Sequence, residues 1–339
     1  MEQEIRFCTT SDDVRIAYAT VGSGPPFVKA ANWLNHLEAD WKSPIWRHLL
    51  DEFSRDQMLV RYDERGNGLS DWKVHDFSQE AFVNDLESVI AATGVDRFPL
   101  LGISQGGAVA IEYAVRHPEK VSHLVLLGAF ARGWRKLDLP VHVAAKREAQ
   151  LALIQNGWGN ENPATRQFFT TLVVPDGTPD EMKSFNEMQR ICTSAANAAS
   201  LFQAFGEMDV LELLPRVKVP TIVFHCRHDA VINFEDGRSI AAAIPGSRFV
   251  PLESKNHLLL SHEPGWYVFV DELRRFIGRA APSDTDEVMV AKACPSCHRL
   301  YSDEMLNFCL DDGSRLLRSP SVIVSDLAAD AEPTRQIDH

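Results

Sequence analysis

The pentapeptide Gly-Ile-Ser-Gln-Gly at residues 102–106 constrains the fold of this chain more than any other feature. It follows the apolar run 98–101, which predicts a buried strand, and precedes the small-residue run 107–117, which predicts a helix that Pro118 ends. A strand that turns this sharply into a helix holds its central residue in a strained conformation, and only glycine-sized neighbours fit beside it. The turn is therefore expected to lift the Ser104 hydroxyl above the sheet, where the N–H groups of the next helix favour developing negative charge.

Strands and helices alternate on both sides of this turn, which predicts an α/β fold with a mostly parallel, doubly wound sheet. Residues 4–10 and 14–20 alternate around a polar turn, so they predict an antiparallel hairpin. Ser78 can cap a helix that runs to about residue 92, and Gly94 can end it. Further strands are expected at 27–31, 58–62, 121–127, 221–226 and 247–252, and further helices at 44–53 and 264–277.

Four other segments carry a family likeness. They are the runs 61–70, 121–127, 223–229 and 256–257, of which the first reads Arg-Tyr-Asp-Glu-Arg-Gly-Asn-Gly-Leu-Ser. Together with the pentapeptide they resemble the α/β-hydrolase superfamily over residues 1–279. The resemblance implies a serine, an acid and a histidine in that order along the chain, which here are Ser104, Asp229 and His257.

A serine hydroxyl is a poor nucleophile at neutral pH, so Ser104 needs a base within hydrogen-bond reach and the base needs an orienting partner. His257 is the candidate base because a short polar loop joins it to the strand 247–252, where the family places its histidine. His262 is the alternative.

Asp229 is the candidate acid because it ends a strand of buried type, which can bring its carboxylate to the same sheet edge as the serine. Its expected work is to hold the imidazole in the useful tautomer and to stabilise imidazolium. His225, inside the same strand, is expected to be structural. Asp63 is expected to be structural too, in a loop whose turn Arg65 and two glycines define.

Two backbone N–H groups are needed to stabilise the oxyanion of a tetrahedral intermediate. Gln105, the residue after the nucleophile, is the first candidate donor. The second should come from the loop after the strand 27–31, where the family usually has His-Gly and this chain has Ala31-Asn32-Trp33. The expected donor is the N–H of Trp33, with Asn32 as the alternative.

The alternation of strands and helices stops between residues 133 and 212, where helical patterns dominate and the apolar run 172–174 is too short to assign. Members of the superfamily often insert a helical cap at this position, and we interpret the segment in that way. Most of its aromatic residues are expected to pack the cap and a few to face the pocket. The bulky candidates are Trp134, Trp158, Phe168 and Phe202.

The identity of the nucleophile narrows the chemistry. Dehalogenases and epoxide hydrolases of the superfamily carry aspartate at this position, so the serine disfavours both. The resemblance implies hydrolysis of carboxylic esters with small to medium acyl groups through an acyl-enzyme, with no cofactor for catalysis. A lactonase or a C–C hydrolase would use the same three residues. An alternative of another class is a ligand-sensing module with weak catalysis.

After a polar, proline-containing linker at 280–290, the segment 291–318 resembles a truncated zinc ribbon. The expected ligands of one tetrahedral zinc are Cys294, Cys297, Cys309 and Asp312, the last in place of a fourth cysteine.

Two alternatives stay open for this segment: His298 as the fourth ligand, or a hairpin that holds no metal. The module could also dock a protein partner. The acidic tail at 319–339 is expected to be disordered.

Composition excludes several other classes of protein. A formal net charge of −13 disfavours a nucleic-acid partner, which would require a basic face. No apolar run is long enough to span a membrane, and the charged N-terminus lacks the apolar core of a secretory signal. Cys8, Cys192 and Cys226 are expected to be ordinary buried or half-buried thiols. These features predict a cytoplasmic protein that acts on a small molecule.

Overall fold

The computed structural model describes residues 2–278, 292–296, 300–301, 307–309 and 312–318. Internal contacts divide the chain into two units, residues 1–269 and 270–339. The predicted linker at 280–290 and the predicted acidic tail at 319–339 lie outside the described residues.

The first unit is built on an eight-stranded sheet with the strand order β1-β2-β4-β3-β5-β6-β7-β8. β1 and β2 form the predicted hairpin, in which Glu4 pairs with Thr20. β2 is also antiparallel to β4, and every other neighbouring pair in this sheet is parallel. The predicted α/β sheet is thus confirmed. The strands are β1 (Glu4–Thr9), β2 (Arg15–Val21), β3 (Pro26–Lys29), β4 (Met58–Tyr62), β5 (Phe98–Ile103), β6 (Val121–Leu127), β7 (Thr221–Cys226) and β8 (Arg248–Leu252).

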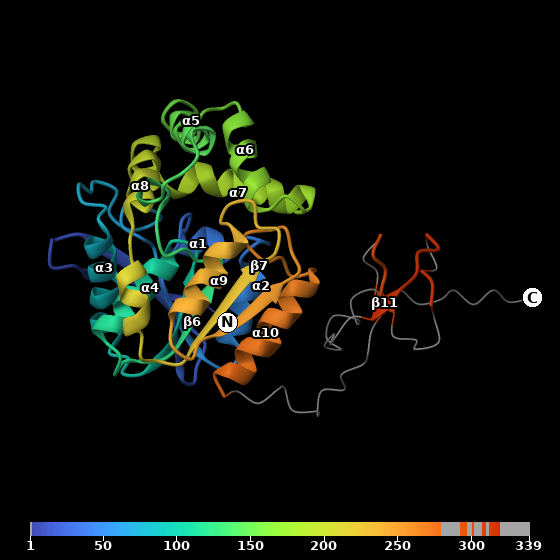
Figure 1. The fold of residues 1–339 in the computed structure, drawn as a ribbon, viewed down its shortest axis with the longest axis horizontal. Helices are drawn as coiled ribbons and strands as arrows, with labels where there is room; N and C mark the ends of the chain where they lie inside the picture. Colours follow the sequence, from blue (N-terminus) through green and yellow to red (C-terminus); the bar gives the residue numbers. More distant parts are fainter. Residues whose placement is uncertain (1, 279–291, 297–299, 302–306, 310–311, 319–339) are drawn as a thin grey trace, which may run out of the picture. The chain divides into compact units, whose positions relative to one another are not determined.

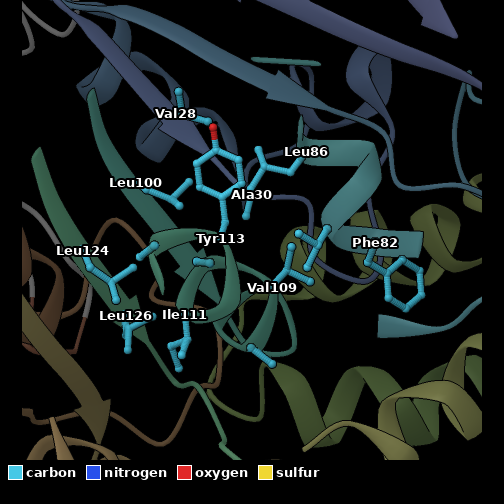
Figure 2. Packing of buried hydrophobic residues seen from close by; sticks show 14 of the residues in the cluster. Val28, Ala30, Phe82, Leu86, Leu100, Val109, Ile111, Tyr113, Leu124 and Leu126 are labelled. Carbon is cyan, nitrogen blue, oxygen red and sulfur yellow. The ribbon is translucent and has the colours of Figure 1, made fainter. Parts of the chain in front are cut away.

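Helices cover both faces of this sheet, because successive side chains along a strand point to opposite sides. On one face, apolar strand residues pack against α3 (Gln79–Thr93) and α4 (Gly106–Arg116), as Figure 2 shows. The labelled residues of this core are Val28, Ala30, Phe82, Leu86, Leu100, Val109, Ile111, Tyr113, Leu124 and Leu126. α9 (Phe234–Ala243) adds Ile240 to the same cluster.

Aromatic rings contribute to the packing of the opposite face. Phe27 stacks on Phe53 of α2 (Arg47–Ser54) with ring centroids 4.6 Å apart. Phe224 of β7 meets Phe269 of α10 (Pro264–Phe276) edge-on at 4.8 Å. Apolar side chains therefore cover both faces of the sheet.

The two helix-end signals predicted for α3 are confirmed. The Ser78 hydroxyl accepts the N–H of Ala81 at 3.2 Å, and Gly94 ends α3 at a φ of 67°. The helix predicted from residue 44 begins only at Arg47. The short helix α1 (Leu37–Asp40) was not predicted.

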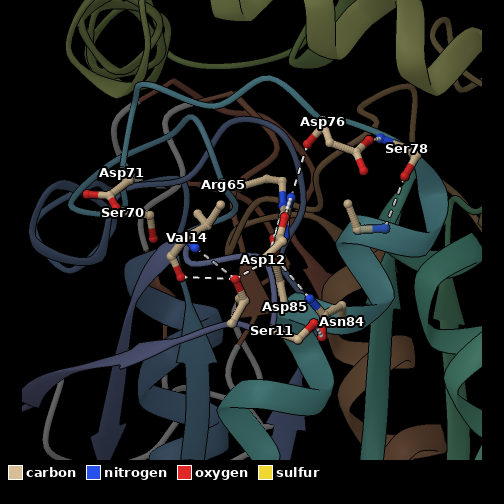
Figure 3. A network of polar contacts seen from close by, with 12 residues as sticks. Ser11, Asp12, Val14, Arg65, Ser70, Asp71, Asp76, Ser78, Asn84 and Asp85 are labelled. Atoms are coloured by element: carbon tan, nitrogen blue, oxygen red, sulfur yellow. Dashed lines mark hydrogen bonds and ion pairs between the residues drawn. The ribbon is translucent and has the colours of Figure 1, made fainter.

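A buried ion-pair network secures the loop after β4 (Figure 3). The Arg65 side chain is fully buried and pairs with Asp85 at 2.6 Å and with Asp12 at 2.8 Å. Asp63 accepts the N–H of Leu69 at 2.8 Å. Removing Arg65 would leave the Asp85 carboxylate buried without a countercharge, a change that typically costs about 3–5 kcal/mol. These contacts support the structural roles expected of Asp63 and Arg65.

Four helices, here called the inserted helices, lie between β6 and β7: α5 (Val141–Gly157), α6 (Ala164–Val173), α7 (Pro179–Cys192) and α8 (Ala195–Glu207). The short 3₁₀ turns η1 (Trp134–Lys136) and η2 (Leu211–Arg216) flank them. Figure 1 shows the inserted helices gathered at the end of the sheet toward which β7 points. The run 172–174, which the sequence left unassigned, closes α6 and supplies its C-cap, Val174.

In the second unit, three short strands form an antiparallel sheet with the order β10-β9-β11. They are β9 (Lys292–Ala293), β10 (Leu300–Tyr301) and β11 (Leu317–Arg318). Cys294, Cys309 and Leu316 form a small buried cluster beside them. Across the described residues of the whole chain, no helix is long and apolar enough to cross a membrane.

Candidate active site

Ser104 lies at the end of β5, in the sharp turn that the sequence predicted. Its φ of 54° places it in the left-handed region, which is rare for a residue with a side chain. Its N–H donates to the carbonyl of Leu127 at 3.0 Å, which ties the turn to the neighbouring strand β6. A strained residue of this kind persists only where its surroundings define it closely.

Steric contacts explain both glycines of the pentapeptide. A Cβ on Gly102 would lie 2.7 Å from the carbonyl oxygen of Gly106, and a Cβ on Gly106 would lie 2.4 Å from that of Ala31. Neither backbone group can move aside cheaply. The turn and the loop after β3 are therefore in direct backbone contact, so the candidate nucleophile and the expected oxyanion loop are adjacent.

The candidate acid and base are hydrogen-bonded to each other. His257 Nδ1 donates to Asp229 Oδ2 at 2.6 Å, and the Asp229 side chain is fully buried. The other carboxylate oxygen accepts the N–H groups of Val231 at 2.8 Å and Ile232 at 3.1 Å. One oxygen is thus held by its own loop while the other faces the imidazole.

These contacts also set the charge of the acid. Burial alone would raise the pKa of Asp229, but the charge and hydrogen bond of His257 and the two loop N–H groups outweigh burial. The net result is a pKa below the usual value, so Asp229 is ionised at neutral pH and can stabilise a protonated imidazole.

Gly128 connects the acid–base pair to the serine turn. It follows Leu127, whose carbonyl accepts the Ser104 N–H. A Cβ at this position would lie 3.2 Å from His257 Cε1 and 3.5 Å from Asp229 Oδ2. The three sequence-predicted residues therefore gather around Gly128 at one sheet edge, and Gly128 itself was not singled out in the sequence.

The loop that carries His257 is held by the inserted helices. Its backbone N–H donates to the carbonyl of Val173, the last residue of α6, at 2.8 Å. The side chain of Asn256, which is fully buried, accepts the N–H of Asp176 at 2.9 Å. No sequence signal could have identified Val173, because it acts through a backbone carbonyl that every residue has.

The expected oxyanion donors lie on the two segments that touch at Gly106. Within residues 2–278, the backbone N–H groups of Gln105, Asn32 and Trp33 donate no hydrogen bond to another described residue. Free N–H groups beside a strained serine are what a developing oxyanion requires. Asn32 is buried and Trp33 is half-buried.

Aromatic side chains of the inserted helices pack on Trp33. Trp158 stacks on it with ring centroids 5.4 Å apart, and Phe205 meets it edge-on at 5.9 Å. Phe202 lies 6.4 Å from Trp33 and 6.0 Å from Trp134. Three of the four aromatic candidates thus belong to one group around Trp33.

Phe168, the fourth aromatic candidate, lies on α6 and is 36% exposed. Its ring meets that of Phe169 at 5.2 Å, and Phe169 meets Trp158 at 6.0 Å, so Phe168 reaches Trp33 only through two intermediate rings.

Of the other two candidate histidines, His225 also lies beside the acid, with its Nε2 3.7 Å from Asp229 Oδ2, whereas His262 lies elsewhere. His225 is buried and its Nε2 contacts the carbonyl of Ile232 at 3.2 Å, in the loop that follows Asp229. Burial lowers its pKa, so it is neutral at physiological pH. His262 is exposed and its Nδ1 lies 3.7 Å from a Glu181 carboxylate oxygen. Neither arrangement supports a role as base.

A surface cavity of about 450 Å³ lies between the start of α3 and α8, lined in part by His75, Gln79, Gln203 and Glu207. None of its lining residues belongs to the serine turn or to the acid–base pair, so this cavity is separate from the candidate site.

In the second unit, Cys294, Cys309 and Asp312 bring one ligand atom each to within 4.8 Å of one another. Cys294 Sγ lies 3.2 Å from Asp312 Oδ2, and it also accepts the N–H of Ser296 at 3.3 Å. Cys297 and His298, the other candidate ligands, lie outside the described residues. The expected thiols Cys8, Cys192 and Cys226 are free, and the last two are buried.

Comparison with known proteins finds relatives that match most of this chain. The AB hydrolase superfamily protein YisY of Bacillus subtilis (strain 168) is 26% identical over 261 residues, which span 74% of this chain and 91% of that protein. The pyrrolizixenacetamide deacetylase of Xenorhabdus hominickii is 25% identical over 279 residues, 78% of this chain and 95% of that protein. The crystal structure of a hydrolase from Pseudomonas aeruginosa PA01 has a TM-score of 0.67 and 25% identity, covering 81% of this chain and 98% of that one.

A family model for the alpha/beta hydrolase fold matches residues 38–264, which include the serine turn, the inserted helices and the acid–base pair. With its strand order, strained serine and sheet-edge histidine, the chain belongs to the α/β-hydrolase fold family.

Proposed function

We propose that this protein hydrolyses carboxylic esters through an acyl-enzyme, with Ser104 as nucleophile, His257 as general base and Asp229 as the acid that orients it. One observation carries the proposal. The hydrogen bond of 2.6 Å between His257 and Asp229 lies next to Gly128, and the preceding residue, Leu127, accepts the N–H of Ser104. Chain order, strand ends and burial all support the same three residues.

In the acylation step, Ser104 Oγ attacks the ester carbonyl carbon as its proton passes to His257 Nε2. The Asp229 carboxylate accepts from Nδ1 throughout and stabilises the imidazolium without taking the proton. Collapse of the tetrahedral intermediate breaks the bond to the alcohol oxygen. The imidazolium protonates that oxygen, the alcohol leaves, and the acyl group stays on Ser104.

In the deacylation step, water takes the place of the alcohol. His257 removes a proton from the water as its oxygen attacks the acyl carbon. The second tetrahedral intermediate collapses, the proton returns to Ser104 Oγ, and a carboxylic acid is released. In both intermediates the oxyanion would accept hydrogen bonds from the N–H groups of Gln105 and Trp33, with Asn32 as the alternative donor.

The aromatic group around Trp33 supports esters with small to medium acyl groups, because apolar rings shield a site from water and bind apolar chains. The name of the Xenorhabdus relative describes a deacetylase, an activity that also removes an acyl group. A lactonase or a C–C hydrolase remains an alternative with the same residues. A ligand-sensing module with weak catalysis is the alternative of another class.

A series of p-nitrophenyl esters from acetate to decanoate tests the proposal and separates these classes. We expect saturable hydrolysis with a maximum at a short or medium chain. Covalent addition of a serine-directed organophosphate to a peptide containing Ser104 would support the nucleophile directly. Lack of turnover on every ester, with the folded protein still binding acyl compounds, would favour the sensing module.

We also propose that the second unit binds one structural zinc ion through Cys294, Cys309, Asp312 and Cys297. Zinc bonds of about 2.0–2.3 Å in a tetrahedron separate the ligand atoms by about 3.3–3.8 Å. The three described ligand atoms, all within 4.8 Å of one another, fit that arrangement. The ion would replace an apolar core in a segment too short to form one.

Metal analysis of the full chain tests this assignment. We expect one zinc per chain, lost in Cys309→Ser and retained in Cys8→Ser, a half-buried thiol of the first unit that serves as the control. Equal metal content in both variants would contradict the site. A chain that ends after Ala281 should lose the zinc and keep esterase activity, because the proposed triad lies upstream of the linker.

A further inference from the structure

Lys29 is a buried lysine at the end of the apolar strand β3. Its side chain is only 5% exposed, and its neighbours Val28 and Ala30 belong to the main core. β3 is parallel to β5, and Lys29 pairs in register with Leu101, three positions before Ser104. Its side chain therefore extends close to the sheet edge where the candidate site lies.

The ammonium of Lys29 has few partners for a buried charge. Its Nζ donates to Asn32 Oδ1, lies 3.4 Å from the carbonyl oxygen of Ala30 and stands 5.0 Å above the Trp46 ring. Burying a cation is costly unless it is well paired. The hydrolysis steps proposed above do not use this group, so its retention requires another explanation.

Four charged groups face Lys29: Asp40 from α1, Arg61 from β4, and Asp63 and Glu64 from the loop after β4. Burial lowers the pKa of Lys29 to about 8, with the three carboxyl groups opposing that shift and Arg61 adding to it. Lys29 is thus mainly an ammonium at neutral pH and loses its proton slightly above it.

Asn32 connects this ammonium to the expected oxyanion loop. Its side chain is 1% exposed, and while Oδ1 accepts from Lys29, its Nδ2 lies 3.4 Å from the Trp33 carbonyl oxygen. The loop has no glycine at the position where the family usually has one. The backbone direction of the loop must then be set by contacts. The buried chain of contacts from Lys29 through the Asn32 side chain reaches both loop residues with free N–H groups, Asn32 and Trp33.

We propose that Lys29 is a positioning residue, whose ammonium holds the Asn32 side chain and thereby fixes the loop 30–33 with its backbone N–H groups directed at the oxyanion on Ser104. The inference rests on the proposed function. Lys29 does not touch substrate in this scheme and acts through Asn32.

The test compares Lys29→Met, Asn32→Leu and the double variant in the full chain. Both changes keep volume and remove one partner of the bridge, and neither removes a backbone N–H. Lys218→Met is the matched control. Lys218 is exposed and precedes the amino end of β7, whereas Ser104 follows the carboxyl end of β5. Thermal unfolding of each variant reports folding.

The kinetic measurements are kcat and KM on p-nitrophenyl butyrate and the inhibition constant of an arylboronic acid, which forms a tetrahedral adduct on serine. We expect each single variant to lower kcat by about 10–100-fold. A misplaced oxyanion donor should reduce kcat about as much as a partly lost donor does. KM should change less than about 3-fold, and boronate affinity should fall in parallel with kcat. The kcat of the double variant should be no lower than that of the less active single variant, because the two side chains act as one unit.

A pH profile adds a readout that a purely structural lysine would not change. Below pH 8 the ammonium is present, so kcat should fall above that value in the wild type and stay level in Lys29→Met. Because burial also raises the pKa of Glu64 to about 8, Glu64→Gln is measured beside it. Glu64 carries little negative charge below that raised pKa, so Glu64→Gln should keep the fall in kcat near the same pH, whereas Lys29→Met should abolish it.

Folded Lys29→Met protein with wild-type kcat and boronate affinity would overturn the proposal, as would a rise in KM alone. If Lys29→Met does not fold, Asn32→Leu carries the same test. Ser104→Ala distinguishes the two levels of the argument. An inactive Ser104→Ala beside an unaffected Lys29→Met removes only the positioning role, whereas an active Ser104→Ala removes the proposed hydrolysis itself.

Discussion

The nucleophile and the base are held in place by different kinds of contact. Ser104 is confined by its own turn, where two glycines leave no room for a Cβ and the serine takes a φ of 54°. His257 is held from far along the chain, through the carbonyl of Val173 and the Asp176–Asn256 bond. The inserted segment therefore holds the loop that carries the base.

The largest expected effect tests whether the nucleophile and the base act as one catalytic unit. Ser104→Ala and His257→Ala should each lower kcat by about 10⁴-fold or more on p-nitrophenyl butyrate, and the double variant should lose little further. The physical reason is that the hydroxyl cannot attack without a base and the base has nothing to activate without the hydroxyl.

Steady-state kinetics with active-site titration by an organophosphate measures this effect. Additive losses of kcat in the double variant would mean that the two residues act independently and do not form one site. Near-wild-type turnover in Ser104→Ala would mean that another residue is the nucleophile.

The next effect concerns the turn that confines Ser104. Gly106→Ala should lower kcat by about 100-fold or destabilise the protein by about 1–3 kcal/mol, because the new methyl group meets the Ala31 carbonyl oxygen at 2.4 Å. Gly94→Ala is the control, since no atom lies within 4 Å of a Cβ there, although its φ of 67° brings its own backbone strain.

Urea unfolding and kcat measure the two outcomes separately. A Gly106→Ala enzyme that matches wild type in both would show that the turn tolerates adjustment, and its local confinement would be refuted.

A smaller effect is expected on the long-range side. Asn256→Ala removes the bond to the Asp176 N–H and should lower kcat by about 10-fold while KM stays nearly constant, because the base loop is displaced but the substrate pocket is not. Lys255→Ala is the matched control, since its exposed ion pair with Asp176 at 3.2 Å is worth less than about 1 kcal/mol. Equal kinetics for the two variants would remove the inserted helices from base positioning.

The smallest effect separates aromatic residues within the inserted helices. Phe202→Ala should shift preference among acyl chain lengths by about 1–3 kcal/mol in kcat/KM, because its ring belongs to the group around Trp33. Phe168→Ala changes the same residue type at a ring that reaches Trp33 only through Phe169 and Trp158, and it should shift the preference less. A p-nitrophenyl ester series on both variants measures the difference, and equal shifts would show that the group around Trp33 does not line the substrate pocket.

Much of the fold could be predicted because its signals are local. The N-terminal hairpin, the Ser78 and Gly94 helix ends and the strand-turn-helix at Ser104 all depend on side chains within a few residues of one another. The late start of α2 and the missed helix α1 show the limit: both are short elements whose ends rest on packing and on a His36 cap rather than on a periodic pattern.

Other parts of the site could not be predicted from residue types. Val173 acts through its carbonyl, and Gly128 matters only because β6 brings it against the imidazole. Lys29 left a visible signal, a charge inside an apolar strand, but its partner Asn32 follows from the way the loop folds back over the strand end.

The sequence by itself determined which chemistry this chain can host: a serine in a turn that admits only glycine neighbours, followed in order by an acid and a histidine at strand ends. These features are local because sterics and strand alternation act over a few residues. Tertiary structure alone decided how the base loop is anchored, which aromatic rings meet Trp33 and what the buried lysine bonds. Those contacts join residues far apart in the chain, and only close packing of the folded core selects among the partners that the sequence allows.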